Sequence, residues 1–226
     1  KPACPLCGDT GYDKKGVCRC LRQYYAREQL QELSRLLPLG EARFETFRFD
    51  LYDSAEWEGY GISPRANMER NFDVCRDFAC QFSRGGGDLL LSGGTGLGKT
   101  FLSACIARVV SESGFSVVYD TAKLENDKFR PDEETAAEVR RCEGCDLLIL
   151  DDLGTEMTTS FVQSALYQLV NGRMIAGRST IISTNLDPDQ IGRRYSAQIM
   201  SRLEGEFELL PFIGQDIRRL KREQQR

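Results

Sequence analysis

The chain has 226 residues, of which 41% are hydrophobic, which suits one globular domain of moderate size with an appendage. Its formal net charge of −4 argues against a dedicated basic nucleic-acid binder, and the absence of histidine excludes serine–histidine triads and histidine-ligated zinc. No apolar run approaches the roughly 20 residues that a membrane helix needs, so we expect no membrane association.

The first twenty residues contain four cysteines. The Cys4-x-x-Cys7 pair, followed by glycine, and the tighter Cys18-x-Cys20 pair together offer four thiolates, the ligand set of a closed structural zinc site. The alternative is a redox pair, although nothing thioredoxin-like surrounds the cysteines. We therefore predict a zinc-binding module with a connecting helix in residues 1–37 and a second domain in residues 38–226.

The other cysteines indicate the cellular compartment. The chain has nine cysteines in total. We interpret them as a sign of a reducing cytoplasm and of metal binding, and not as a disulfide framework. Cys142 and Cys145 also form a Cys-x-x-Cys pair but lack two further ligands. Cys145 is therefore expected in the core at a strand start, and Cys142 is incidental. The chain lacks the pattern of a signal peptide, and because it begins with Lys1 we expect that an upstream segment has been trimmed.

Elements with helical and strand periodicity follow in order. Leucines at helical spacing predict a helix within residues 21–37, and residues 39–62 read as a surface linker. Ser63 before Pro64 marks the start of a helix that extends to about residue 82. Apolar strands are then predicted at 88–92, 115–120, 146–150, 179–184 and 207–210, with helical segments at 99–110, 121–141 and 161–175. This alternation predicts an α/β fold, a five-stranded parallel sheet sandwiched by helices.

The stretch GGTGLGKT, residues 93–100, lies between a predicted strand and a predicted helix and fits the pattern G-x-x-x-x-G-K-[ST]. Glycines let backbone N–H groups surround phosphate oxygens, and the helix directs its positive end at the same anion. Lys99 would reach the β- and γ-phosphates, and the Thr100 hydroxyl would hold Mg²⁺. The alternative is a glycine-rich turn that matches by chance. The predicted nucleotide contacts are Gly93, Gly94, Thr95, Gly96, Leu97, Gly98, Lys99, Thr100 and Phe101.

Polar side chains follow two other predicted strands. Asp151 ends the third strand, where a carboxylate can hold Mg²⁺, and Asp152 follows at the position of a water-orienting carboxylate or base. The alternative is a solvated acidic turn. Asn185 ends the fourth strand, and its amide can orient the attacking water, because ligands of parallel sheets lie at the carboxyl ends of strands. The alternative is that Asn185 starts the turn before Pro188.

In this order, the elements resemble the AAA+ ATPases, which are P-loop NTPases. The motifs ILDDLGTE, IISTNL and IMSRLEG, at residues 149–156, 181–186 and 199–205, resemble more narrowly the bacterial DnaC/DnaI helicase-loader family, which is similar to the IstB transposition helper ATPases. The resemblance covers residues 40–220, and the cysteine segment resembles the zinc-binding segment of DnaI-type loaders. It implies self-assembly with ATP between subunits, a hexameric DnaB-type replicative helicase as partner, and delivery of that helicase to single-stranded DNA.

The resemblance also implies roles for particular residues. Arg202 matches an arginine finger that reaches a neighbouring subunit's ATP and is worth ~10³–10⁵ in rate; the alternative is a surface arginine. Arg218 resembles a second sensor arginine, with Arg219 as its competitor. A single-strand-binding surface is implied at Lys128, Phe129, Arg130, Thr159 and Phe161, with a solvated turn as the alternative for 128–130 and core packing as the alternative for Phe161.

Two departures from the family pattern change these expectations. The usual Asp-Glu pair is replaced by Asp151-Asp152, and the shorter second carboxylate predicts slow hydrolysis. Fifteen residues follow Pro211, which leaves no room for a full lid domain. We therefore expect the adenine to be covered mainly by the segment ARFETF, residues 42–47, and by neighbouring subunits.

The sequence thus predicts an ATPase that uses ATP, Mg²⁺ and Zn²⁺ and loads a replicative helicase onto single-stranded DNA. One alternative is a transposition helper ATPase, which would serve a transposase. The other is a nucleotide-gated adaptor with negligible turnover.

Overall fold

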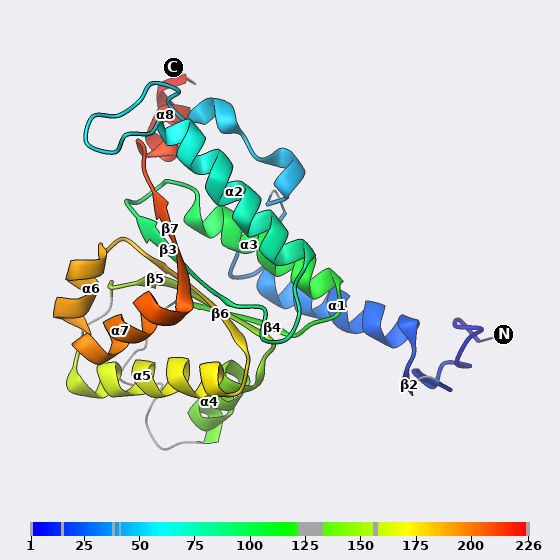
Figure 1. Ribbon diagram of the computed structural model, residues 1–226. Coiled ribbons are helices and arrows are strands. Elements are labelled where there is room, and N and C mark those ends of the chain that lie inside the picture. Colours follow the sequence, from blue (N-terminus) through cyan, green and yellow to red (C-terminus); the bar gives the residue numbers. More distant parts are fainter. Residues whose placement is uncertain are drawn as a thin grey trace.

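The computed structural model describes residues 2–14, 16–37, 39–40, 42–121, 133–155 and 158–224. Its centre is a five-stranded parallel sheet in the order β4-β5-β6-β3-β7 (Figure 1). All five predicted strands are present, and the predicted fold class is confirmed. The strands are β3 (Asp88–Gly93), β4 (Val117–Thr121), β5 (Leu147–Leu153), β6 (Ser179–Thr184) and β7 (Phe207–Phe212).

Helices cover both faces of the sheet (Figure 1). The first face packs against α1 (Arg19–Leu33), α2 (Pro64–Cys80) and α3 (Lys99–Glu112). The second packs against α4 (Glu133–Gly144), α5 (Ser160–Ile175), α6 (Pro188–Arg194) and α7 (Ala197–Glu206). The described part of the chain ends with α8 (Ile217–Gln224), which follows β7. Among the described helices, none has the length and apolar character needed to cross a bilayer.

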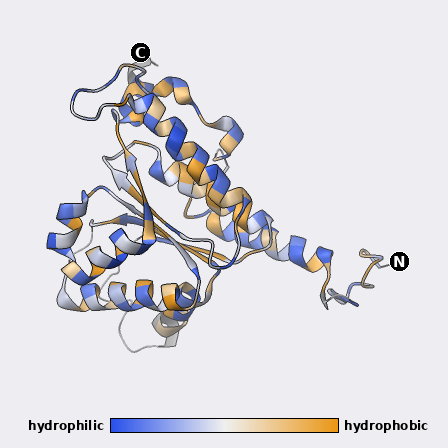
Figure 2. Cartoon of the chain, viewed as in Figure 1, coloured by the Kyte–Doolittle hydropathy of each residue, from blue (hydrophilic) through white to orange (hydrophobic). Residues whose placement is uncertain are grey.

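A hydrophobic core lies on each face of the sheet, and alternate side chains of each strand point into one core or the other. In β5, Leu147 and Ile149 belong to the first core, whereas Leu148 and Leu150 belong to the second. This is the two-residue period of a strand, and because both faces are covered every one of these positions is apolar. Figure 2 shows hydrophobic residues along the central strands and hydrophilic residues on the outward faces of the surrounding helices.

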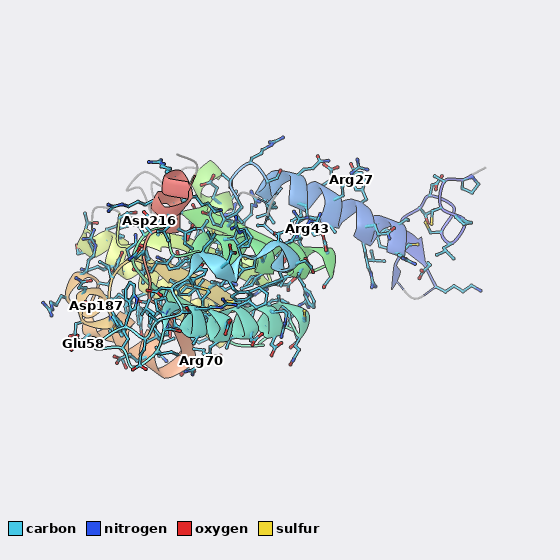
Figure 3. All side chains as sticks on the ribbon, turned by 90° about the horizontal axis from the view of Figure 1, so that it is seen from above. Arg27, Arg43, Glu58, Arg70, Asp187 and Asp216 are labelled. Carbon is cyan, nitrogen blue, oxygen red and sulfur yellow. The ribbon has the colours of Figure 1, made fainter. Side chains whose placement is uncertain are left out.

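Helix α1 connects the N-terminal segment to the sheet. The helix predicted within residues 21–37 begins earlier, at Arg19, and ends at Leu33. Gln29 is buried, and its side-chain amide donates to Ser111 Oγ at 2.5 Å and accepts from Val117 N of β4 at 2.9 Å. The other end of α1 projects from the body with residues 2–14 and 16–18, which include the short hairpin of β1 (Tyr12–Asp13) and β2 (Gly16–Val17) (Figures 1 and 3).

The predicted surface linker is partly inserted into the first core. It contains two short 3₁₀ helices, η1 (Phe44–Thr46) and η2 (Phe49–Leu51). The rings of Phe44, Phe47 and Phe49 lie 5.4, 5.2 and 5.0 Å from the ring of Phe72 on α2. The aromatic residues of ARFETF are therefore used for packing on α2.

Candidate functional site

The loop between β3 and α3 has backbone conformations that glycine adopts readily. Gly96 and Gly98 have φ angles of +71° and +100°, in the left-handed region where a Cβ is strained. A Cβ at Gly93 would overlap the backbone of Phe212, and a Cβ at Gly96 would overlap the Asp216 carboxylate. The predicted phosphate loop thus needs glycine for close packing as well as for access to an anion.

Two residues outside the motif hold this loop in place. The Tyr52 hydroxyl donates to the Leu97 carbonyl at 2.9 Å, and the Ile217 N–H donates to the Gly96 carbonyl at 3.0 Å. Tyr52 is buried, and this burial raises the pKa of its hydroxyl. Sequence reasoning missed Tyr52, which follows ARFETF, because an aromatic residue in an irregular segment has no distinguishing pattern.

Lys99 joins the loop to the end of β6. Its amine donates to the Gly93 and Gly94 carbonyls at 2.6 and 2.7 Å and to Asn185 Oδ1 at 2.8 Å. Asn185, at the end of β6, therefore lies beside the phosphate loop, as expected for a residue that contacts the same ligand. The Asn185 amide nitrogen is a donor that can orient a water molecule.

Burial also makes the Lys99 amine easier to deprotonate. The side chain is 5% exposed, and desolvation lowers the pKa of its amine to about 8. The carboxylates of Asp152 and Asp151 oppose this shift, while the positive charge of Arg218 adds to it. A phosphate at this amine would supply negative charge and restore the protonated form.

Asp151 lies within a group of hydroxyl donors. Its Oδ2 atom accepts from Thr100 Oγ1 at 2.9 Å and from the Tyr119 hydroxyl at 2.8 Å, and its Oδ1 atom accepts from Ser183 Oγ. Tyr119 and Ser183 lie on β4 and β6, the strands on either side of β5. Burial raises the pKa of Tyr119, so its hydroxyl stays a donor. Sequence reasoning found Thr100 and Asp151 but missed the other two donors.

Mg²⁺ prefers hard oxygen ligands from carboxylates, hydroxyls, water and phosphates. Thr100 Oγ1 and the Asp151 carboxylate supply two such groups at hydrogen-bond distance from each other. The residues present therefore fit a magnesium ion that is shared with a bound nucleotide.

Asp152 has an unusual backbone for its type. Its φ angle is +57°, and the register between β5 and β6 shifts between Leu150 and Leu153, as at a β-bulge. The Asp152 N–H donates to Ser183 Oγ at 3.0 Å, and its side chain is exposed. Aspartate tolerates this left-handed conformation better than residues with longer side chains, which gives a backbone reason for aspartate at this position.

The two candidate arginines occupy different places. Arg202 is exposed on α7. Arg218 is exposed at the start of α8, where its N–H donates to Asp216 Oδ1, and its charge acts on Lys99. Figure 3 shows Asp216 beside α8, well separated from Arg27 on α1.

The candidate DNA contacts are only partly described. Lys128, Phe129 and Arg130 lie outside the described residues. Thr159 is the N-cap of α5, and its hydroxyl accepts from the Val162 N–H at 3.2 Å. The Phe161 side chain is 47% exposed, which favours a surface role over the core packing that was the alternative.

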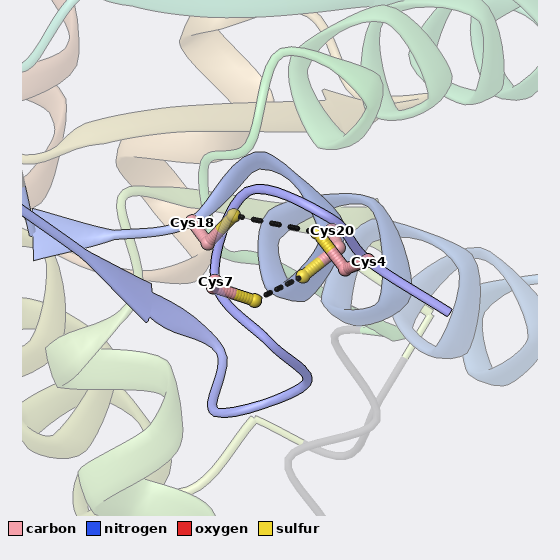
Figure 4. Close-up of side chains that lie close together, drawn as sticks. All are labelled: Cys4, Cys7, Cys18 and Cys20. Atoms are coloured by element: carbon pink, nitrogen blue, oxygen red, sulfur yellow. Dashed lines mark hydrogen bonds between the residues drawn. The ribbon is translucent and has the colours of Figure 1, made fainter. Parts of the chain in front are cut away.

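The four N-terminal cysteines converge on one point (Figure 4). Cys4 Sγ lies 3.9 Å from Cys18 Sγ, Cys7 Sγ lies 3.4 Å from Cys20 Sγ, and all four sulfurs lie within 4.8 Å of one another. Zn–S bonds of about 2.3 Å in a tetrahedron place sulfurs about 3.8 Å apart. The cluster therefore fits zinc in both donor type and spacing.

The backbone around this cluster is organised by local bonds. Asp9 accepts from the Cys4 N–H at 2.7 Å, and the Gly8 N–H donates to the Cys4 carbonyl at 3.0 Å. Desolvation acts to raise the pKa of Cys7, but hydrogen bonds from Cys20, the Gly11 backbone, Cys4 and Cys18 together outweigh it and lower that pKa to about 7. Cys18 is the N-cap of α1, so the cluster is joined directly to that helix.

Residues 68–222 match the family of IstB-like ATP-binding proteins. The chain is 23% identical to the replicative helicase loader DnaC of Escherichia coli K12, over 68% of this chain and 64% of DnaC. It is 26% identical to a putative ATP-binding protein in an insertion sequence of Mycobacterium tuberculosis, over 73% of this chain and 62% of that protein. The chain thus spans less than two thirds of the length of these curated relatives.

The fold is similar to a solved structure. A crystal structure of DnaI superimposes with a TM-score of 0.62 at 19% identity, over 80% of this chain and 92% of that chain. At this identity the likeness concerns the fold, and it matches the AAA+ architecture that the motifs predict.

Proposed function

Because the chain belongs to the IstB-like ATP-binding proteins, we propose that it binds and slowly hydrolyses ATP in order to load a replicative helicase onto single-stranded DNA. The observation that carries the ATP-binding part is the convergence of Lys99 with Asn185 and of Thr100 with Asp151 at the ends of three parallel strands. Ligands of open parallel sheets bind at this edge.

The chemistry follows from these positions. Lys99 exchanges its bonds to loop carbonyls for phosphate oxygens and so neutralises the charge that develops in the transition state. Thr100 and Asp151 would hold Mg²⁺, which would supply Lewis-acid polarisation of the phosphoryl oxygens. The Asn185 amide and the exposed Asp152 carboxylate orient the attacking water. Since Asp152 reaches less far than glutamate, hydrolysis is slow.

A second subunit completes the site. Arg202 is exposed on α7 and free to approach ATP held by a neighbouring copy. Such a finger adds positive charge at the transferring phosphoryl group. Self-assembly through this contact makes hydrolysis depend on the state of the assembly.

Two observations support the loader over other uses of ATP. The chain is similar in sequence to a replicative helicase loader, DnaC. It also has a cysteine module at its N-terminal side that projects from the ATPase body and is available to a partner (Figure 1). The exposed Phe161 ring supports contact with single-stranded DNA by stacking, assembled over several subunits because the chain is acidic.

Copurification tests whether a replicative helicase is the partner of the chain. The chain should retain the replicative helicase of the same cell in ATP and retain less with Lys99→Ala, while Cys80→Ser on α2 serves as an unaffected control. The helicase should then associate with single-stranded DNA only when the chain is added. Failure of helicase and chain to associate in any nucleotide state contradicts the loader function.

A transposition helper is the second candidate, favoured by the similarity to the insertion-sequence protein. Retention of a transposase in place of the helicase in the same experiment would support it. An adaptor without turnover is distinguished by the steady-state ATPase rate with single-stranded DNA, because it binds ATP but releases no phosphate above background.

A further inference from the structure

The buried carboxylate of Asp151 has more hydrogen-bond donors than the phosphate-loop motif provides. Thr100 belongs to the motif, but Tyr119 and Ser183 come from the two neighbouring strands. Asp151 is 3% exposed, so water has little access to its oxygens and the three hydroxyls determine how the carboxylate is oriented.

The register of the sheet explains why Tyr119 reaches this position. In the pairing of β4 with β5, Tyr119 lies opposite Ile149, and Thr121 lies opposite Asp151. Alternate residues of a strand share a face, so Tyr119 and Asp151 are on the same side of the sheet. The long tyrosine side chain spans the two-residue offset and places its hydroxyl 2.8 Å from Asp151 Oδ2. A shorter hydroxyl residue at this register position would not reach.

The two oxygens of Asp151 are held differently. Oδ2 accepts from both Thr100 and Tyr119, whereas Oδ1 accepts from Ser183. If Thr100 turns its hydroxyl oxygen to a metal, Tyr119 still holds Oδ2. The carboxylate is thereby kept in one orientation whether or not Thr100 is engaged.

On this basis, and resting on the proposed ATPase function, we propose that Tyr119 is a positioning residue that fixes the Asp151 carboxylate for magnesium–nucleotide binding. Ser183 assists from the other side. Residues that orient metal-binding carboxylates typically change metal affinity or activity by about 10- to 100-fold when removed. Tyr119 has no contact with the reacting atoms in this role and acts only through Asp151.

The test substitutes Tyr119→Phe, which keeps the ring and its packing and removes the hydroxyl. Nucleotide binding is measured by titration of a fluorescent ATP analogue, first with a chelator and then over a range of Mg²⁺ concentrations. We expect the Mg²⁺ concentration for half-saturation to rise about tenfold, while binding without Mg²⁺ changes less than twofold. Tyr167→Phe, the same change in a half-buried residue of the second core, is the control and should match the wild type.

A purely structural role is excluded by a parallel thermal melt and by a second variant. Ser183→Ala should also raise the Mg²⁺ requirement, and because Ser183 accepts from the Asp152 N–H it should in addition slow hydrolysis. An unchanged Mg²⁺ requirement in folded Tyr119→Phe, with normal wild-type binding, overturns the positioning role alone. A wild-type chain that binds no nucleotide at any Mg²⁺ concentration contradicts the nucleotide site and this role with it.

Discussion

The Lys99 amine donates a hydrogen bond to Asn185 Oδ1 across 2.8 Å, although the two residues are 86 positions apart in the chain. One belongs to the phosphate loop and the other to the end of β6. Their contact means that the residue proposed to bind the phosphate and the residue proposed to orient water are directly hydrogen-bonded.

Asn185→Ala should therefore separate binding from chemistry. Nucleotide affinity should stay within about threefold, because the substitution leaves Lys99 and the loop glycines in place to bind phosphate, while the hydrolysis rate should fall about 10²-fold, as when one positioned donor is removed. Asn185→Asp keeps the acceptor for Lys99 but loses the amide donor, so it should be equally slow. Steady-state phosphate release and calorimetry measure the two effects. A normal hydrolysis rate in Asn185→Ala would mean that Asn185 only starts the turn before Pro188 and does not orient water.

Nucleotide affinity should depend on pH above neutrality. Burial lowers the pKa of free Lys99 to about 8, and a bound phosphate raises it, so the complex holds more protons than the free chain. Affinity is then fully present below pH 8 and falls by up to about tenfold per pH unit as pH rises through that value. Calorimetry between pH 7 and 9.5 measures this slope. Lys99→Arg keeps its charge over this range, and any affinity that it retains should be flat; a flat wild-type profile would contradict the assignment.

Asp152 should respond differently to loss of charge and to added length. Asp152→Asn keeps the left-handed backbone and should bind ATP normally but hydrolyse it more slowly. Asp152→Glu, whose carboxylate reaches further, should hydrolyse ATP faster, and we expect it to be less stable by about 1 kcal/mol because its φ angle of +57° suits aspartate better. Thermal melts and phosphate release test this, with Asp189→Glu on α6 as a control. A faster and equally stable Asp152→Glu would show that the backbone does not explain the departure from the family pattern.

Zinc should be held at one ion per chain by the cysteine cluster. The Cys4→Ser/Cys7→Ser variant should lose the metal, because two thiolates rarely retain structural zinc. The melting of the ATPase body should change little, since Gln29 and Leu33 dock the other end of α1 independently. Elemental analysis checks the first expectation and thermal melting the second. Full zinc content in the double variant would mean that the ligands lie elsewhere.

Arg202 should act between subunits. Arg202→Ala should bind ATP nearly as well as wild type but hydrolyse it far more slowly, since its own phosphate ligands remain. Mixing Arg202→Ala with Lys99→Ala chains should recover activity, because one mixed interface pairs an intact finger with an intact phosphate loop. An ATPase titration of one variant into the other measures the recovery. If mixed assemblies form and activity never exceeds the sum of the separate variants, Arg202 is a surface arginine.

The sequence predicted those parts of the fold that local patterns encode. Strands β3 and β5 were visible because strands buried on both faces have continuous apolar runs, here Leu89–Leu91 and Leu147–Leu150. The Ser63 N-cap of α2 was visible because its hydroxyl and Pro64 are adjacent. Helices α6 and α7 were not predicted as elements. Asp187 and Gln190 form a capping box at the start of α6, a signal that the sequence contained and that could have found that helix.

The candidate site was predicted in outline for the same reason. The phosphate loop and Asp151 have local signatures, whereas Tyr119 and Ser183 are single hydroxyl residues in strands and look like ordinary strand formers. Their convergence on Asp151 depends on β4 and β6 flanking β5, which no local pattern specifies. The left-handed backbone of Asp152 likewise results from a shift in register between two strands.

The bond between Gln29 and the Val117 N–H has a consequence for how the chain behaves in solution. Strand β4 is the outermost of the described strands of the sheet, and an outermost strand with unpaired N–H groups is a template on which another molecule can add a strand. Because the buried Gln29 side chain of α1 already accepts from the Val117 N–H, that N–H cannot pair with a strand of another molecule. A version of the chain that lacks α1 would expose this edge of β4. Its tendency to aggregate would then come from the uncovered Val117 N–H, even if its phosphate loop were intact.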